Sequence, residues 1–569
     1  MTDESIYEKA PWLKLYPSDV PPAIEIPVKS IGDAFDETVQ KRKKRNAIIY
    51  YGRKISYQKL GDMVDRFATA LSALGIKKGD RVALLLLNSP EFFTAFFGVV
   101  KLGAVIVPIS PVYVSSEIKH QLTDSGAETI ICQDFLYDVV EKTGVKLKNV
   151  ILTNIGESLP RFKKLMGKSI LREVYQKMAL PDSDVYLKEG FHQLKELVAQ
   201  HQPNPPEVDI NPKEDILSLP YTGGTTGPPK GVMLTHYNAM AGAIQFAAFY
   251  PSLCEEGRET FVSYMPFYHQ AGQALLMLRG IIYGGTQVVL TNPDLDDIIN
   301  SVVQYRATFF LGAPSIYEAL KDYKKTGRID WKKFKAVASG ADQLHEFTQE
   351  DWQARTGVPL HDMWGMTECS DIVIGTPLGK VKIGSVGIPL PNVMAAILDP
   401  DKDEFFPAGE LGELAIISPT ITEKGYWQKP DATKECESVI NGGKWWRTGD
   451  LAKMDEDGYF FIYDRKRDLI KYKGLRVFAR EVEEVLKLNP NIKEIGVVGV
   501  KDQKVGEVVK AVIVLESDAR GKISEADITE YCKDKLASYK IPRIVEFVGE
   551  IPKTDVGKVS RREIREEEL

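Results

Sequence analysis

Short apolar runs alternate with amphipathic stretches through about the first 340 residues of the chain. The runs at 82–87, 104–109, 129–132 and 149–153 are almost wholly apolar, which is typical of strands buried on both faces. Between them, Pro90 to Leu102 and Ser115 to Asp124 have the pattern of helices, and further apolar runs follow at 286–290, 307–311 and 335–338. Buried strands separated by helices predict parallel sheets with βαβ crossovers.

The pattern changes after about residue 384, where NVMAAILD, GELAIIS and GYFFIYDR predict short strands joined by turns. From about Arg467 onward, helical patterns (REVEEVLKL, EADITEYCKDKL) alternate with strand patterns (EIGVVGV, VVKAVIVL). The charged stretch DRKRD at 464–468 lies between these two regions. The predicted fold class is therefore α/β, with a large N-terminal domain over 1–465 and a small α+β C-terminal domain over 466–569. The large domain would hold two parallel-type α/β subdomains and a β-rich subdomain.

Composition adds limits to this picture. At 569 residues the chain is too long for one ordinary core, and 44% hydrophobic with 27% charged residues is typical of a soluble globular enzyme. The net charge of −6 gives no basic footprint, so nucleic acid is not expected as a partner. Five cysteines without a CxxC pair suggest neither a zinc cluster nor a disulfide framework, and fit the reducing cytoplasm.

Membrane insertion is not expected either. The N-terminus MTDESIYEKAPWLKLYP lacks the basic and apolar regions of a signal peptide. The most apolar stretch, 82–112, is interrupted by polar and charged residues and is too broken for a transmembrane segment. Peripheral contact with a membrane stays open.

The first candidate for chemistry is YTGGTTGPPKG at 221–231, directly after the apolar run ILSLP. Glycines allow close approach of the backbone to a phosphate, threonine hydroxyls donate hydrogen bonds, and a lysine neutralises charge. The segment is not a Walker A loop, because Pro228 and Pro229 precede the lysine. It predicts a phosphate-binding loop formed by Thr222, Gly223, Gly224, Thr225, Thr226, Gly227 and Lys230.

This segment resembles the phosphate loop of the adenylate-forming superfamily, which includes acyl-CoA synthetases, luciferases and the adenylation domains of peptide synthetases. The family usually has Tyr-Thr-Ser-Gly-Thr-Thr-Gly-x-Pro-Lys-Gly, and Gly223 replaces the serine here, as in fatty acyl-CoA ligases. The resemblance covers roughly residues 30 to 566. It implies an enzyme that converts a carboxylic acid and Mg-ATP to an acyl-adenylate and then passes the acyl group to coenzyme A.

Further motifs extend the resemblance. MWGMTE at 363–368 resembles the family's aromatic-Gly-x-Thr-Glu motif, which implies that Trp364 stacks on adenine, Thr367 reaches the α-phosphate and Glu368 binds Mg²⁺. SGADQL at 339–344 takes the place of Ser-Gly-Gly-Ala-Pro-Leu, with departures at 341–343. The remaining nucleotide-binding residues implied by these two segments are Gly340, Ala341, Asp342, Asp362, Met363, Gly365 and Met366.

The segment PFYHQAG at 266–272 bears on the acid. His269 aligns with a family histidine at the mouth of the acyl tunnel, which implies a role in positioning or gating. Amino-acid-activating relatives carry an aspartate after the phenylalanine, whereas this chain has Tyr268, so an amino acid is disfavoured as substrate.

The last motifs concern the ribose and the second half-reaction. In WRTGDL at 446–451, the resemblance implies that Asp450 accepts both ribose hydroxyls. In DRKRDLIK at 464–471, it implies that Arg465 reaches the ribose and the phosphate. Arg467 falls at the family's hinge, about which a mobile small domain rotates between the two steps. The resemblance also implies coenzyme A contacts for Lys471, Lys473 and Gly474. It implies that Lys558, in IPKTDVGK, is the lysine of the adenylation step. Lys558 is expected to contact both the substrate carboxylate and the α-phosphate.

Several alternatives remain open from the sequence. The Gly-Gly phosphate loop favours a medium- or long-chain fatty acid, while short hydroxy acids and aryl acids are not excluded. The acceptor could be a carrier protein instead of coenzyme A, and a luciferase-type oxygenase or a catalytically silent binding protein would share the same motifs. A monomer or homodimer in the cytoplasm is expected.

Overall fold

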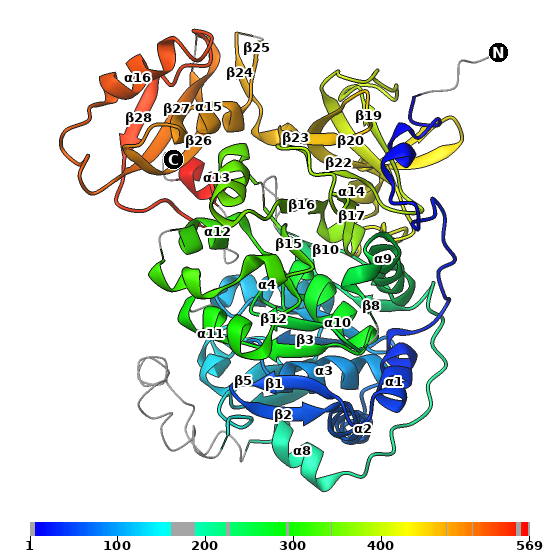
Figure 1. Ribbon diagram of the computed structural model, residues 1–569. Coiled ribbons are helices and arrows are strands. Elements are labelled where there is room, and N and C mark those ends of the chain that lie inside the picture. Colours follow the sequence, from blue (N-terminus) through cyan, green and yellow to red (C-terminus); the bar gives the residue numbers. More distant parts are fainter. Residues whose placement is uncertain are drawn as a thin grey trace.

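The described part of the chain folds into four β-sheets with helices packed around them, and a two-stranded ribbon (Figure 1). The computed structural model describes residues 6–160, 188–222, 228–255, 257–291, 295–321, 323–342, 344–473, 475–502, 504–553 and 559–566.

The first α/β unit is built on a seven-stranded sheet in the order β11-β8-β4-β3-β5-β6-β7. Its strands from β8 to β7 run parallel, and β11 pairs antiparallel with β8. The four apolar runs of the first 160 residues all form strands here, as predicted. The strands are β3 (Arg81–Leu85), β4 (Val105–Pro108), β5 (Thr129–Gln133), β6 (Asn149–Thr153), β7 (Phe191–Gln193), β8 (Ile216–Ser218) and β11 (Leu234–Thr235).

Helices cover this unit, and their ends follow local sequence signals. Ser89 accepts a hydrogen bond from the backbone N–H of Phe92 at 3.4 Å, and Pro90 is the first helical residue, so this helix begins where the sequence predicts. The principal helices are α1 (Ile31–Lys41), α2 (Tyr57–Ala73), α3 (Pro90–Lys101), α4 (Ser115–Ser125), α8 (Leu194–Gln200) and α9 (His236–Phe249).

The second unit contains a nine-stranded sheet in the order β18-β17-β16-β15-β14-β12-β13-β1-β2. Its centre is parallel as predicted, but β2, β17 and β18 pair antiparallel at its edges. The strands are β1 (Asn46–Tyr50), β2 (Arg53–Ser56), β12 (Thr260–Ser263), β13 (Thr286–Val289), β14 (Phe309–Gly312), β15 (Ala336–Ser339), β16 (Leu360–Gly365), β17 (Ile372–Gly375) and β18 (Ile388–Pro389). The helices include α10 (Arg279–Ile282), α11 (Leu295–Tyr305), α12 (Pro314–Lys321) and α13 (Glu346–Thr356).

The pairing of β1 with β13 was not predicted. The two strands lie parallel in register, with Ile48 opposite Gln287, although they are far apart in the sequence. This pairing makes a strand from near the N-terminus part of the second sheet and joins the two α/β units.

The β-rich unit forms as predicted and is wholly antiparallel, with β19 (Met394–Leu398), β20 (Gly412–Ile417), β21 (Glu437–Ile440), β22 (Gly443–Met454) and β23 (Phe460–Arg465). The C-terminal unit has its own sheet of β24 (Ile470–Tyr472), β25 (Leu475–Val477), β26 (Ile492–Asp502), β27 (Gly506–Leu515) and β28 (Ile544–Phe547). Its helices are α15 (Ala479–Lys487), α16 (Glu525–Lys533) and α17 (Arg561–Glu566). Figure 1 shows these two units side by side above the α/β body, joined through β23. The predicted fold class is confirmed, while the domain boundary after residue 465 stays a prediction.

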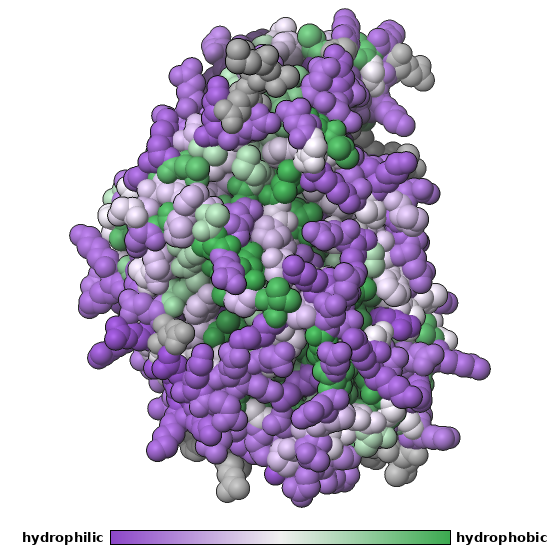
Figure 2. All heavy atoms as spheres, turned by 90° about the vertical axis from the view of Figure 1, so that its right-hand side faces the viewer, coloured by the Kyte–Doolittle hydropathy of each residue, from purple (hydrophilic) through white to green (hydrophobic). Residues whose placement is uncertain are grey.

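Among the described residues, no helix combines the length and the apolar character needed to cross a membrane. The face of the molecule in Figure 2 is largely hydrophilic, with scattered hydrophobic patches across its middle.

His236, the first residue of α9, makes folding stability depend on pH. Its Nδ1 accepts a hydrogen bond from the backbone N–H of Ile31 at 3.2 Å, and burial lowers the pKa of the imidazole from 6.5 to about 4. Below about pH 6.5 the unfolded chain therefore binds a proton at His236, whereas the folded chain binds it only near pH 4. The contribution of His236 to the free energy of unfolding is thus present above pH 6.5 and is lost as the pH falls toward 4. We expect His236 alone to lower the free energy of unfolding by about 2 kcal/mol between pH 7 and pH 5.

Urea unfolding at pH 7 and pH 5 measures this loss. His236→Asn, which keeps a side-chain acceptor but does not titrate, is expected to lose about 2 kcal/mol less than the wild type over the same interval. An equal loss in both proteins would contradict the assignment.

Candidate active site

The ends of the predicted phosphate loop meet in a short hairpin. β9 (Tyr221–Thr222) pairs antiparallel with β10 (Lys230–Gly231), with Thr222 opposite Lys230. A side chain at Gly231 would come within 3.2 Å of the Tyr221 ring, so glycine allows the hairpin to close tightly. The other residues of the prediction, Gly223, Gly224, Thr225, Thr226 and Gly227, lie outside the described residues.

Helix α4 holds both ends of this segment. Asp124 Oδ2 accepts a hydrogen bond from the Tyr221 hydroxyl at 2.8 Å, and His120 Nε2 lies 2.8 Å from the carbonyl oxygen of Pro229, to which it donates. His120 and Asp124 are four residues apart and therefore share one helix face. Neither residue was predicted from the sequence, because only their spacing on a predicted helix marks them.

We therefore expect His120→Ala to weaken ATP binding. Loss of one hydrogen bond is worth about 1 kcal/mol, which corresponds to a rise of about fivefold in the KM for ATP in acid-dependent ATP–pyrophosphate exchange. His120→Gln, whose amide nitrogen can donate from a similar position, should restore most of the affinity. His192→Ala, a change of the same kind in β7, is the control. Equal KM values for the alanine and glutamine variants would contradict the role of the donated hydrogen bond.

Lys230 and Glu368 both contact Tyr426, a residue that was not predicted from the sequence. Lys230 Nζ lies 4.8 Å from the centre of the Tyr426 ring, and the Tyr426 hydroxyl donates to Glu368 Oε1 at 2.7 Å. The backbone N–H of Trp427 donates to the Gly231 carbonyl at 2.8 Å, which holds this segment beside β10. Burial, with the negative charge of Glu368 next in importance, raises the pKa of the Tyr426 phenol, which therefore stays a hydrogen-bond donor.

The second motif lies at the carboxyl end of β16, beside the end of β15. Gly340 follows β15, and a side chain there would approach the Met363 carbonyl oxygen to 3.4 Å. Ala341 has a left-handed φ of 68°, so the chain turns sharply next to Asp342. The carboxyl ends of parallel strands are where α/β enzymes bind ligands, which agrees with the nucleotide role predicted for 340–342 and 362–366.

Asp362, at this strand end, is buried. Its Oδ1 accepts a hydrogen bond from the backbone N–H of Met363 at 3.0 Å. Burial raises the pKa of the carboxyl group from 3.8 to about 8, so the group is largely protonated near neutral pH and can donate a hydrogen bond.

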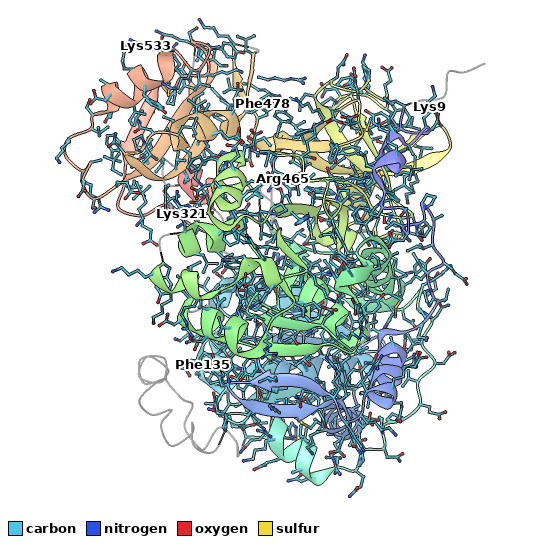
Figure 3. All side chains as sticks on the ribbon, viewed as in Figure 1. Lys9, Phe135, Lys321, Arg465, Phe478 and Lys533 are labelled. Carbon is cyan, nitrogen blue, oxygen red and sulfur yellow. The ribbon has the colours of Figure 1, made fainter. Side chains whose placement is uncertain are left out.

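Trp364, Asp450 and Arg465 form one cluster. The Trp364 indole N–H donates to Asp450 Oδ2 at 2.9 Å, and Arg465 Nε lies 2.6 Å from Asp450 Oδ1. Asp450 and Arg465 face each other across β22 and β23. Arg465, labelled in Figure 3, lies where the β-rich unit leads to the C-terminal unit. The negative charges of Asp450 and, to a smaller extent, Glu368 raise the pKa of the Arg465 guanidinium.

The PFYHQAG segment lies against the end of β3 and against the segment that follows Glu368. Asn88 donates to the Met265 carbonyl and accepts from the Phe267 backbone N–H, both at 2.8 Å. Gln270 donates to the carbonyl oxygen of Ser370. His269 Nδ1 accepts from the backbone N–H of Ala271 at 3.3 Å. The segment that carries His269 therefore contacts the chain just after Glu368 through Gln270, and the role of His269 in positioning or gating stays a prediction.

The segment predicted to contain the hinge runs from β23 through a short 3₁₀ turn (Lys466–Asp468) into β24. Arg467 is exposed in this turn, and Lys471 and Lys473 are exposed on and after β24. Gly474 and Lys558, the other two residues predicted for the C-terminal unit, lie outside the described residues. Arg561 binds Asp464 on the other side of the turn, with Nη1 2.7 Å from Oδ1.

Glu368 is the residue that fits a magnesium ion. Mg²⁺ is usually bound through one or two carboxylates together with substrate phosphates, so a single carboxylate beside a phosphate loop matches that pattern. Within the described part of the chain, no group of three or more His, Cys, Asp or Glu side chains is placed to hold a metal ion.

Comparison with known proteins identifies the family. Residues 35–427 match the sequence profile of AMP-binding enzymes, and residues 481–558 match that of the AMP-binding enzyme C-terminal domain. The chain belongs to this family of adenylate-forming enzymes.

Relatives match over nearly the whole chain. Long-chain-fatty-acid–CoA ligase of Escherichia coli O6:H1 is 35% identical, with 98% of each chain covered, and the Bacillus subtilis enzyme of the same name is 34% identical with the same coverage. Among solved structures, ATP-bound MatB from Rhodopseudomonas palustris matches with a TM-score of 0.80 at 27% identity, covering 95% of this chain and 99% of that one.

Proposed function

We propose that this chain is a fatty acid–CoA ligase that forms an acyl-adenylate and prefers long-chain acids. The observation that carries the proposal is the cluster of Trp364, Asp450 and Arg465 beside Glu368, in a chain of which full-length relatives are named long-chain-fatty-acid–CoA ligases. Gly223 in the phosphate loop supports the same acid class.

The first half-reaction joins the acid to AMP. A carboxylate oxygen attacks the α-phosphorus of ATP, the bond to the bridging oxygen of the β-phosphate breaks, and pyrophosphate leaves with that electron pair. Asp450 can accept both ribose hydroxyls, since a carboxylate has about four lone-pair sites and two are taken by Trp364 and Arg465. Lys230 and Lys558 offset the negative charge that builds up when a carboxylate approaches a phosphate. A magnesium ion held by Glu368 would neutralise part of the phosphate charge.

In the second half-reaction the thiol of coenzyme A attacks the acyl carbonyl. A thioester forms, AMP leaves with the electron pair of the mixed anhydride bond, and the thiol proton is released. We propose that rotation about Arg467 withdraws Lys558 and brings Lys471, Lys473 and Gly474 to the site. Such a hinge confines the backbone change to a few residues.

We also propose a location and an assembly for the protein. All five cysteines are free thiols, which supports the reducing cytoplasm as the place where the enzyme works. We retain a monomer or homodimer as the proposed assembly.

A panel of acids from two to eighteen carbons, with aryl acids added, tests the substrate class. Each buried methylene contributes about 0.8 kcal/mol, so kcat/KM for pyrophosphate release should rise steeply with chain length in a long-chain enzyme. Free coenzyme A as sole acceptor separates this proposal from a carrier-protein loader. Highest activity with short or aryl acids, or no thioester with free coenzyme A, would overturn the substrate or the acceptor assignment.

A further inference from the structure

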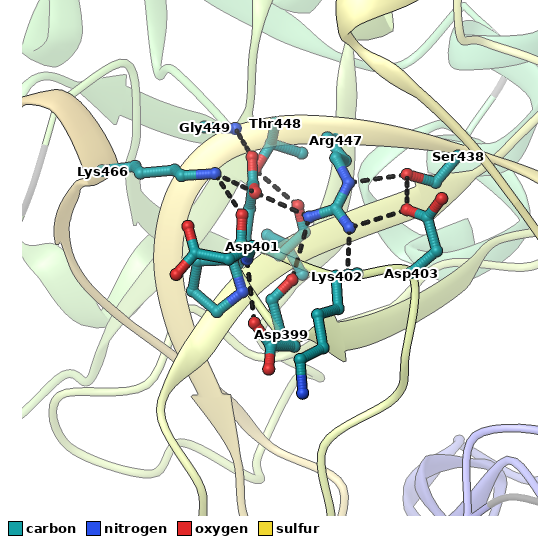
Figure 4. Close-up of polar contacts among 12 residues, drawn as sticks. Asp399, Asp401, Lys402, Asp403, Ser438, Arg447, Thr448, Gly449 and Lys466 are labelled. Carbon is teal, nitrogen blue, oxygen red and sulfur yellow. Dashed lines mark hydrogen bonds and ion pairs between the residues drawn. The ribbon is translucent and has the colours of Figure 1, made fainter.

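Glu413 in β20 is a buried carboxylate to which the proposed mechanism assigns no role. Its side chain is only 5% exposed, and it contacts three donors on two other strands or their ends. Oε2 lies 2.8 Å from Arg447 Nη1 and 3.1 Å from Lys466 Nζ, while Oε1 accepts from the backbone N–H of Gly449 at 3.2 Å. Figure 4 labels the three donors, Arg447, Gly449 and Lys466, among their polar contacts.

The contact with Gly449 belongs to an irregular part of the sheet. Glu413 pairs with Leu451 and Ala415 with Arg447, so three residues of β22, 448–450, face a single residue of β20. Such a bulge leaves backbone groups without ladder partners and turns a side chain to a new direction. Gly449 has φ of 74°, which glycine tolerates without strain, and its free N–H is satisfied by Glu413.

The side chain that this bulge directs is Asp450. Thr448 supports the same bulge, because its hydroxyl donates to the Leu414 carbonyl at 2.8 Å and accepts from the Asp450 backbone N–H at 3.1 Å. The bulge thus places Asp450 opposite Arg465 and within reach of the Trp364 indole.

Arg447 completes the support from the other side. Its guanidinium makes five hydrogen bonds, which is the number of N–H groups that it has. Besides Glu413, the acceptors are the Ser438 hydroxyl at 2.6 Å, the Asp403 carboxylate at 3.0 Å and the carbonyl oxygens of Asp399 at 3.2 Å and Lys402 at 2.6 Å. This ties the start of the bulge to the loop that joins β19 and β20.

Lys466 connects the Glu413 carboxylate to the predicted hinge. It follows Arg465 directly and precedes Arg467, and its ammonium also donates to the carbonyl oxygen of Pro400. One buried anion therefore contacts the strand that carries Asp450 and the residue that follows Arg465.

We propose that Glu413 is a positioning residue that sets the geometry of the ribose-binding pair Asp450 and Arg465 and fixes the upstream side of the hinge. The inference rests on the proposed function, because it assigns Glu413 a task only if Asp450 and Arg465 bind a nucleotide. Glu413 acts through these residues and does not itself touch the substrate.

Glu413→Gln tests the proposal with little change in volume. The amide has one acceptor oxygen in place of two and presents N–H groups to donors, so it cannot serve Gly449, Arg447 and Lys466 together. The KM for ATP in pyrophosphate exchange should rise about tenfold, while the KM for the acid should stay within about twofold. A merely structural role would lower the amount of folded enzyme and leave both KM values unchanged.

Asp403→Asn is the matched control. It is the same kind of change on the same guanidinium, but Asp403 is 61% exposed and its partners are Arg447 and Ser438, neither of which is Gly449 or Lys466. Its KM for ATP should stay within about twofold of the wild type. An unchanged KM for ATP in Glu413→Gln, or an equal rise in both variants, would overturn the proposal.

The Lys466→Met variant provides a second test of the proposal. It should raise the KM for ATP less than Glu413→Gln does, and the double variant should be no worse than Glu413→Gln alone, because both changes remove the same contact. Additive effects would overturn the shared role. Wild-type enzyme without acid-dependent exchange would count against the proposed function itself, so the two failures are distinguishable.

Discussion

Lys558→Ala is expected to slow acyl-adenylate formation by two to three orders of magnitude while leaving thioester formation from a supplied acyl-adenylate within about threefold of the wild type. Carboxylate attack on phosphorus brings negative charges together, and a lysine that contacts both groups lowers that barrier. The thiol reacts after pyrophosphate has left, when this charge conflict no longer exists. Rapid-quench measurement of each half-reaction separates the two effects.

Lys553→Ala is the control for Lys558→Ala. Lys553 lies in the same motif, is partly exposed, and pairs with Glu494 at 2.7 Å. We expect both half-reactions to stay near wild-type rates in this variant, because partly exposed ion pairs contribute little. Equal losses in the two half-reactions of Lys558→Ala would remove the assignment of Lys558 to adenylation.

The second large effect is expected for Asp450→Ala. The change removes the proposed acceptor of both ribose hydroxyls and leaves Arg465 and the Trp364 indole N–H without their shared partner. Hydrogen bonds to a charged group are worth about 1.5–3 kcal/mol each, so kcat/KM for ATP should fall at least about 100-fold. Initial rates of pyrophosphate exchange at varied ATP measure this fall.

Asp457→Ala, in the turn that joins β22 to β23, serves as the control for Asp450→Ala. Asp457 is 60% exposed and pairs with surface lysines, so its loss should leave kcat/KM for ATP within about twofold. A deoxyribose analogue of ATP adds a second test. If Asp450 binds the ribose, the wild type should discriminate against the analogue and Asp450→Ala should not.

Local sequence patterns were enough to predict much of the fold. The apolar runs of β3, β5 and β6 and the capped start of α3 carry their own signals, because strand burial and helix capping are decided within a few residues. The pairing of β1 with β13 could not be predicted in this way. It depends on packing between segments some 240 residues apart, and many apolar strands would satisfy the same pattern.

The residues of the candidate site likewise fall into those that the sequence predicted and those that it did not. Glu368, Asp450 and Arg465 were found because each lies in a motif with family resemblance, and the structure brings them together. Tyr426 and Glu413 were missed because their significance comes from contacts with distant segments, such as the 58 residues that separate Tyr426 from Glu368. A tyrosine or a glutamate in a strand-rich region has no local signal of such a role.

The central claim is that one nucleotide site, built by Glu368, Asp450 and Arg465, serves the acyl-adenylate. A crystal structure with a stable acyl-AMP analogue tests it most directly. We predict ribose hydroxyls within hydrogen-bonding distance of the Asp450 carboxylate and the phosphate group between Lys230 and Glu368. An analogue bound elsewhere on the protein, or bound with Asp450 turned away from its ribose, would contradict the claim.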